Sequence, residues 1–79
     1  MKVRTLADLK KIKEDDLKRK RLTYIVPKSN LKNGFVRDEL MWVKKVNDHS
    51  FVIFRCMDGK NYKFSQEDLS YLLLVGREK

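Results

Sequence analysis

Apolar and polar positions divide the chain into one segment with helical spacing and several short segments that suit β-strands. The clearest strands are the apolar segments 40–46, 51–57 and 61–64, which two groups of turn formers separate. The middle segment begins with Phe-Val-Ile-Phe, and aromatic and β-branched residues prefer strands. Apolar residues fall on both faces of this strand, so we expect it inside a sheet or a small closed barrel, with Phe54 and Cys56 buried.

The two connections in this meander carry turn signals. Asp58-Gly59 suits the positive φ angles of a two-residue type I′ hairpin turn. Residues 47–50, Asn-Asp-His-Ser, are a run of turn formers. We therefore predict three antiparallel strands joined by two tight turns.

A helix is predicted over residues 6–20. Thr5 suits the N-cap position, and Asp8 three residues later can complete a capping box. Five apolar residues share one half of the helical wheel: Val3, Leu6, Leu9, Ile12 and Leu17. Lys10 and Lys13 interrupt this stripe, so we expect the helix to contribute little to the core.

The segments on either side of the meander are less regular. Residues 22–26 favour a strand that Pro27 ends, and residues 28–34 form a polar loop with a turn signal at Asn33-Gly34. A further strand can begin at Phe35. These features place a long polar connection before the meander.

The C-terminal segment has two interpretations. Ser65 and Asp68 form a second capping signature. We predict one helical turn over residues 66–70 followed by a strand over residues 71–75. One continuous helix over residues 66–75 is the alternative, because its leucines suit a helical face.

The resulting order resembles that of small SH3-like or Sm-like barrels. The residues behind the resemblance are the strand 51–57, the turn Asp58-Gly59-Lys60, the strand 62–64, and the turn 68–70 before the strand 71–75. It covers about the last fifty residues and implies an architecture without any particular activity. Families of this kind bind nucleic acids or peptides. The predicted class is α+β: an N-terminal helix followed by a small antiparallel, mostly meander sheet or an SH3-like or Sm-like barrel.

The length of the chain suits one domain, and the charge distribution indicates two parts within it. The chain has 79 residues, which suits a single domain with a basic helical arm at 1–21 and a β-rich body at 22–79. Residues 1–34 hold eleven Lys and Arg against four Asp and Glu, a net charge of +7, whereas residues 35–79 hold eight against seven, a net charge of +1. A basic arm on a nearly neutral body indicates an anionic partner.

Other features narrow the class of protein. A single cysteine, Cys56, allows no intrachain disulfide and favours a reducing, cytoplasmic location. No apolar run approaches the ~20 residues that span a bilayer, and the N-terminus lacks the apolar part of a secretory signal. The basic helix lacks Trp and Phe on its apolar stripe, which argues against a membrane partner.

The first candidate site is the basic helical segment. Its cationic residues could neutralise the phosphates of DNA or RNA: Lys10, Lys11, Lys13, Lys18, Arg19, Lys20 and Arg21. In the competing interpretation the charges lie on a solvated helix face. Three i,i+4 pairs favour that interpretation: Glu14–Lys18, Asp15–Arg19 and Asp16–Lys20. They leave Lys10, Lys11, Lys13 and Arg21 in excess, so a positive potential remains.

The second candidate site combines aromatic and basic residues near the first meander strand. Tyr24 and Trp42, with Lys44 and Lys45, could form a surface on which single-stranded bases stack. A domain this small also needs its aromatic bulk inside, which favours Trp42 as a core residue. Strand alternation puts Trp42 on the same face as Lys44.

The sequence does not favour a metal site, a cofactor or an enzyme. His49, Cys56, Asp48 and Asp58 match no zinc-ligand spacing. Cys56 is expected to be an inert thiol buried in an apolar strand. No glycine-rich phosphate loop or Ser/His/Asp set is present in the sequence.

These observations favour a non-enzymatic nucleic-acid-binding protein that uses its basic helix for phosphate contacts. The alternative is a small module that docks on an acidic surface of a larger enzyme or machine and inhibits or redirects it. Small basic chains encoded by phages and mobile elements often act in that way. The apolar stripe separates the two: a protein partner needs it exposed in a groove, whereas a nucleic-acid binder folds it onto the body.

Overall fold

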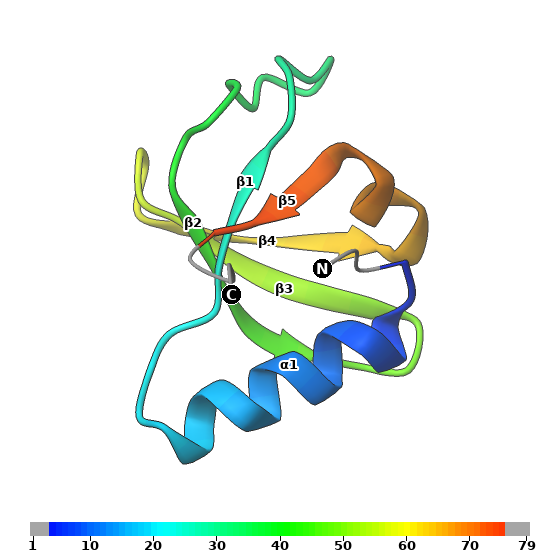
Figure 1. Cartoon of the computed structure of the whole chain (residues 1–79). Helices are drawn as coiled ribbons and strands as arrows, with labels where there is room; N and C mark the ends of the chain where they lie inside the picture. The colour runs from blue at the N-terminus through cyan, green and yellow to red at the C-terminus, as the bar shows by residue number, and fades with distance from the viewer. Residues whose placement is uncertain (1–3, 76–79) are drawn as a thin grey trace.

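The computed structural model describes residues 4–75 and places one helix beside one antiparallel sheet (Figure 1). The elements in chain order are α1 (Leu6–Lys18), β1 (Tyr24–Pro27), β2 (Met41–Val46), β3 (Ser50–Arg55), β4 (Lys60–Ser65), the 3-10 helix η1 (Gln66–Tyr71) and β5 (Leu72–Leu74). The strand order is β4-β3-β2-β1-β5, with β4 and β5 at the two edges. The predicted α+β class is confirmed, and the sheet is open.

Helix α1 starts where the sequence predicts and ends two residues early. The Thr5 hydroxyl accepts a hydrogen bond from the Asp8 N–H (3.2 Å), which caps the first turn. At the other end the Lys20 N–H donates to the Leu17 carbonyl (3.0 Å) and the Arg21 N–H to the Asp16 carbonyl (2.8 Å). Lys20 has φ 58°, so these bonds form a Schellman motif with a lysine in the left-handed position.

The hydrophobic core is shared between α1 and the sheet. Leu6 and Leu9 of the helix belong to the same buried cluster as Met41, Phe51 and Ile53. The expectation that the helix contributes little to the core is therefore wrong. Val3 lies outside the described residues.

The apolar stripe of α1 also ends earlier than predicted. Leu6, Leu9 and Ile12 are buried, whereas Leu17 is 60% exposed. The next buried helical position is Asp16, which is 1% exposed. Asp16 lies seven residues, or about two turns, after Leu9 and is therefore on the same helical face. Leu17, one residue later, lies off that face.

The long connection between β1 and β2 is fastened to the body rather than extended as a strand. Phe35 does not begin a strand, but its ring is buried in the core. The Asn33-Gly34 turn forms as predicted, with Gly34 at φ 96° and its N–H donating to the Leu31 carbonyl (3.2 Å).

The β3–β4 connection differs from the predicted two-residue turn. It comprises four residues, 56–59, because Arg55 pairs with Lys60. Of Asp58 and Gly59 only Gly59 has a positive φ, at 70°, so the type I′ prediction is wrong. Cys56 is exposed in this turn, which corrects its placement inside a strand. The Asp58 carboxylate accepts bonds from Lys60 N–H and the Tyr62 hydroxyl, and these contacts favour the longer turn.

At the C-terminal side the turn-plus-strand prediction holds against the continuous helix. The six residues of η1 lead into β5, which pairs antiparallel with β1 through Leu72–Pro27, Leu73–Val26 and Leu74–Ile25. Figure 1 shows β5, which follows η1, lying beside β1 although the two strands are far apart along the chain. Leu69 and Leu72 complete the buried cluster.

Candidate nucleic-acid interface

A row of three aromatic side chains crosses the sheet on the face opposite the core. Tyr24, Trp42 and Phe54 are cross-strand neighbours in register on β1, β2 and β3. The Trp42 and Phe54 rings stack, with centroids 4.7 Å apart and planes at 23°. Tyr24 meets Trp42 edge to face at 6.3 Å. We call these three residues the aromatic row, and this side of the sheet the outer face.

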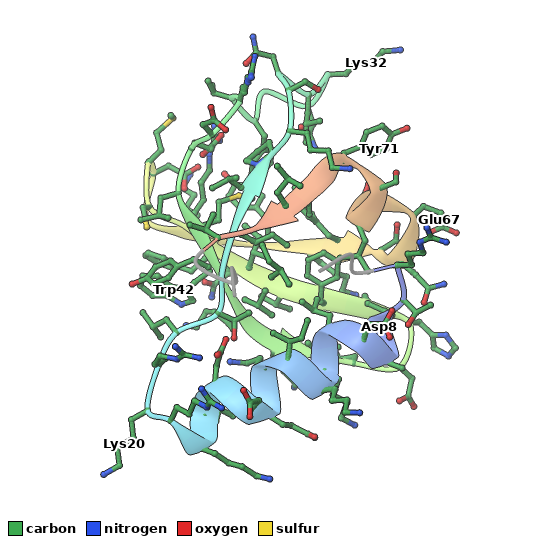
Figure 2. All side chains as sticks on the ribbon, viewed as in Figure 1. Asp8, Lys20, Lys32, Trp42, Glu67 and Tyr71 are labelled. Atoms are coloured by element: carbon green, nitrogen blue, oxygen red, sulfur yellow. The ribbon has the colours of Figure 1, made fainter. Side chains whose placement is uncertain are left out.

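The aromatic row is half-buried and stands outside the core. None of its three members belongs to the buried cluster, which takes Phe51 and Ile53 from the alternate positions of β3. The expectation that Trp42 fills the core is wrong, and so is the expectation that Phe54 is buried. Figure 2 shows Trp42 projecting away from the interior at the left of the view.

Three lysines flank the aromatic row. Lys45 pairs with Val52, and Val52 pairs with Lys63. Lys45 and Lys63 therefore lie on the face of the sheet that carries Val52 and Phe54, which is the outer face. A β-bulge between Val43 and Lys45 sets Lys44 and Lys45 against one partner residue. Both lysines are therefore exposed, whereas strict alternation would turn one of them inward. We call Lys44, Lys45 and Lys63 the lysine flank.

The lysine flank lies within reach of the rings and has no carboxylate beside it on the sheet. The Lys44 Nζ lies 5.9 Å from the centroid of the Phe54 ring, in cation–π geometry. None of the five strands contains Asp or Glu, whereas together they contain five Lys and Arg residues. The outer face therefore combines positive charge with aromatic surface.

The predicted helix cations lie elsewhere and have different roles. Lys10, Lys11 and Lys18 are exposed on α1, and Lys13 is half-buried. They add positive charge to the molecule but lie on a different element from the aromatic row. The structure therefore divides the predicted cationic residues between two surfaces.

Of the three predicted helix ion pairs, the structure contains one. Arg19 Nε lies 3.6 Å from the Asp15 carboxylate. The Asp16 carboxylate instead accepts from the Arg21 guanidinium (3.2 Å) and the Thr23 hydroxyl (2.8 Å). Arg21 therefore supports the fold, and Lys20, predicted to pair with Asp16, is exposed at the helix end (Figure 2).

Two members of this surface were absent from the sequence-based candidates: Phe54 and Lys63. Both lie on the face that strand alternation assigns to Val52. Strand alternation across the β3–β4 hairpin puts Lys63 opposite Phe54 for a two-residue turn and opposite Val52 for a four-residue turn, on the same face in both cases. Lys63 was missed because Phe54, on the same face, was expected to lie in the core.

A second polar cluster holds the β1–β2 connection and is structural. The Arg55 guanidinium donates to both oxygens of Glu39 (2.6 and 2.9 Å) and to the Gly34 carbonyl (3.0 Å), and it lies 4.4 Å above the Phe35 ring. Hydrogen bonding to Glu39 raises the pKa of Arg55 above its ordinary value. The site is filled by its own partners, so it fastens the loop to β3.

Asp58 and Tyr62 extend this cluster toward the turn. The hydrogen bond from the Tyr62 hydroxyl lowers the pKa of Asp58, and the same bond raises the pKa of Tyr62. Arg55 Nη1 lies 3.5 Å from the same carboxylate. The cluster stabilises the charged form of Asp58 at neutral pH.

The metal candidates are not brought together. Asp48 and His49 precede β3 whereas Cys56 and Asp58 follow it, so about 20 Å of strand separates the two pairs. Within residues 4–75 no group of three or more His, Cys, Asp or Glu side chains could hold a metal ion.

Along that same described stretch, no helix combines the length and the apolar character needed to cross a bilayer. Comparisons of the chain with protein-family models, with curated proteins and with solved structures found no match.

Proposed function

We propose that this protein binds nucleic acid without catalysing a reaction, through the outer face of its sheet. The observation that carries the proposal is the joint position of the aromatic row and the lysine flank on a sheet without carboxylates. Lysines bind phosphates and release condensed counterions, which supplies most of the affinity in sequence-independent binding. The exposed lysines of α1 add to the attraction at longer range.

The burial of the helix stripe supports this proposal over a protein partner. A module that docks on an acidic protein through its helix would need Leu6, Leu9 and Ile12 free for a groove. All three are buried against the body. Among the members of the predicted stripe that lie within residues 4–75, Leu17 alone is exposed.

Salt dependence tests the proposal directly. For four to six phosphate contacts, the logarithm of the binding constant falls with the logarithm of salt concentration with a slope of roughly −3 to −5. The measurement is fluorescence anisotropy of labelled oligonucleotides titrated with the intact chain at several salt concentrations. Absence of binding at low salt, or a flat salt response, contradicts the proposal.

Two matched triple variants then locate the contact surface. One variant neutralises the lysine flank (Lys44→Gln, Lys45→Gln, Lys63→Gln) and the other neutralises three exposed helix lysines (Lys10→Gln, Lys11→Gln, Lys18→Gln). Each removes three positive charges, so both reduce the long-range field by a similar amount. We expect the flank variant to reduce the magnitude of the salt slope by about 2–3 and the helix variant to reduce it less. The reverse order would place the site on α1.

A further inference from the structure

We infer that the ligand of the outer face is single-stranded nucleic acid, whose bases stack on the aromatic row while the lysine flank contacts its phosphates. This inference rests on the proposed function and specifies its ligand. The expected ligand is a single strand, and the experiment below compares it with a duplex.

The aromatic row offers what a single strand can use and a duplex cannot. Tyr24, Trp42 and Phe54 lie half-buried on the outer face, whereas the core contains Phe51 from the opposite face of β3. Unpaired bases have free faces that stack on such rings whatever their sequence. In a duplex the bases are already stacked on one another, so the rings would meet the backbone and the base edges in the grooves, but not free base faces.

The lysine flank lies close enough to the rings to serve the same nucleotides. Lys44 Nζ is 5.9 Å from the Phe54 centroid, and Lys45 and Lys63 lie in the adjacent cross-strand row. Phe54 and Val52 are two residues apart on β3, so the row of rings and the row that holds Lys45 and Lys63 lie about 7 Å apart on the same face. This mixture of stacking surface and positive charge is the recognition pattern of proteins that bind single strands without strong sequence preference.

The chain carries its own reporter for this site. Trp42 is the single tryptophan in the sequence, so its fluorescence, excited at wavelengths where tyrosine absorbs little, reports on the aromatic row. The probes are an oligothymidylate strand and the same strand annealed to its adenylate complement, at equal low salt. We expect the single strand to quench Trp42 fluorescence saturably and to bind more tightly than the duplex.

Substitutions separate stacking from charge. We expect Trp42→Leu to weaken single-strand binding by about 5- to 150-fold, the range of loss for one stacked base, and to leave duplex binding nearly unchanged. Trp42→Phe retains a ring and should restore most of the affinity. Tyr71→Leu is the matched control, because Tyr71 is an exposed aromatic residue on η1, outside the aromatic row. Phe54→Leu provides a second test at the stacked neighbour.

The outcomes distinguish this inference from the proposed function. Equal binding of single strand and duplex, with no effect of Trp42→Leu or Phe54→Leu, would overturn the inference and leave nucleic-acid binding standing. Absence of binding to both probes at low salt would overturn both. Circular dichroism of each variant establishes that it retains the fold.

Discussion

Asp16 is a carboxylate with 1% of its surface exposed, in a helix whose other buried positions are aliphatic. Its two oxygens accept from the Thr23 hydroxyl and the Arg21 guanidinium, both of which lie beyond the helix end. A buried carboxylate is tolerated only when such donors replace water. The Asp16 side chain therefore ties the last turn of α1 to the residues that lead into β1.

Removing the Thr23 hydroxyl should destabilise the fold. Thr23→Val keeps the shape of the side chain but takes a hydrogen bond of 2.8 Å from a buried carboxylate. We expect the free energy of unfolding to fall by about 1–3 kcal/mol, measured by urea denaturation followed through Trp42 fluorescence. Asp15→Asn is the matched control: it removes an exposed ion pair at the residue before Asp16 and should change stability by under about 0.5 kcal/mol. A Thr23→Val variant as stable as the parent would show that this bond contributes nothing.

The sequence of β3 does not predict which of its two faces is buried. The segment 51–54 is apolar at every position, so alternation defines two faces without saying which one is buried. The structure buries Phe51 and Ile53, and leaves Val52 and Phe54 half-buried on the outer face. The deciding contacts come from α1 and from Phe35, which are distant in sequence.

At the scale of elements, local signals predicted starts better than ends. The Thr5 cap, the Asn33-Gly34 turn and the capping residues of η1 all act within a few positions, and all appear in the structure. The end of α1 was missed because Lys20, rather than the usual glycine, occupies the left-handed position. The β-bulge at Lys44 was missed because no residue type announces it.

The β3–β4 turn gives a pH-dependent prediction. The pKa of Asp58 is lowered in the folded state, so its contribution to stability is present above the unfolded pKa of about 3.9 and is lost as pH falls through the lower folded value. The pKa of Tyr62 is raised, so its contribution is present below the unfolded pKa of about 10 and is lost as pH rises through the higher folded value. Both effects arise mainly from one hydrogen bond.

Tyr62→Phe removes that bond and keeps the ring. We expect the variant to melt at a lower temperature at neutral pH, and its melting temperature to fall less steeply in acid and in alkali than that of the parent. The measurement is thermal unfolding by circular dichroism across the pH range. Tyr71→Phe, at an exposed tyrosine, should reproduce the parent profile. Parallel profiles for Tyr62→Phe and the parent would contradict the assigned bond.

For the whole molecule, the sequence predicted the order of the elements, but the net charge of each half did not indicate where the positive surface lies. Residues 35–79 have a net charge of only +1, which suggested a neutral body. In the described part of that region, each acidic residue lies in a connection or in η1. The charged residues of the strands are all Lys or Arg. A net charge averages over sequence, whereas a binding surface depends on which residues share a face.

The shared core predicts that the body does not fold well without its helix. Deleting residues 1–21 would expose the surface now covered by Leu6, Leu9 and Ile12, each of which is at most 6% exposed. At roughly 1.5–3 kcal/mol for each buried aliphatic side chain, the loss approaches the 5–15 kcal/mol total stability of a typical domain. We expect the proton–nitrogen NMR spectrum of residues 22–79 to lose its dispersion.

The control for this deletion is the full chain with Lys10, Lys11 and Lys18 changed to Gln, which alters the charge of α1 without touching its buried face. That variant should keep the dispersed spectrum. A dispersed spectrum from residues 22–79 alone would mean that the sheet holds its fold independently and that α1 is an accessory element.

The bulge in β2 also affects how the strand can change length. Ordinarily, losing one residue from a strand turns every later side chain to the opposite face. At Lys44 the extra residue is already present, since Val43 faces Ile53 and Lys45 faces Val52. A chain lacking Lys44 would leave a regular ladder in which Val43 and Val46 still point to the core and Lys45 still points to solvent. The bulge is thus a point where a one-codon deletion subtracts a positive charge from the outer face while sparing the interior, so charge there can vary among descendants of this gene without a change of fold.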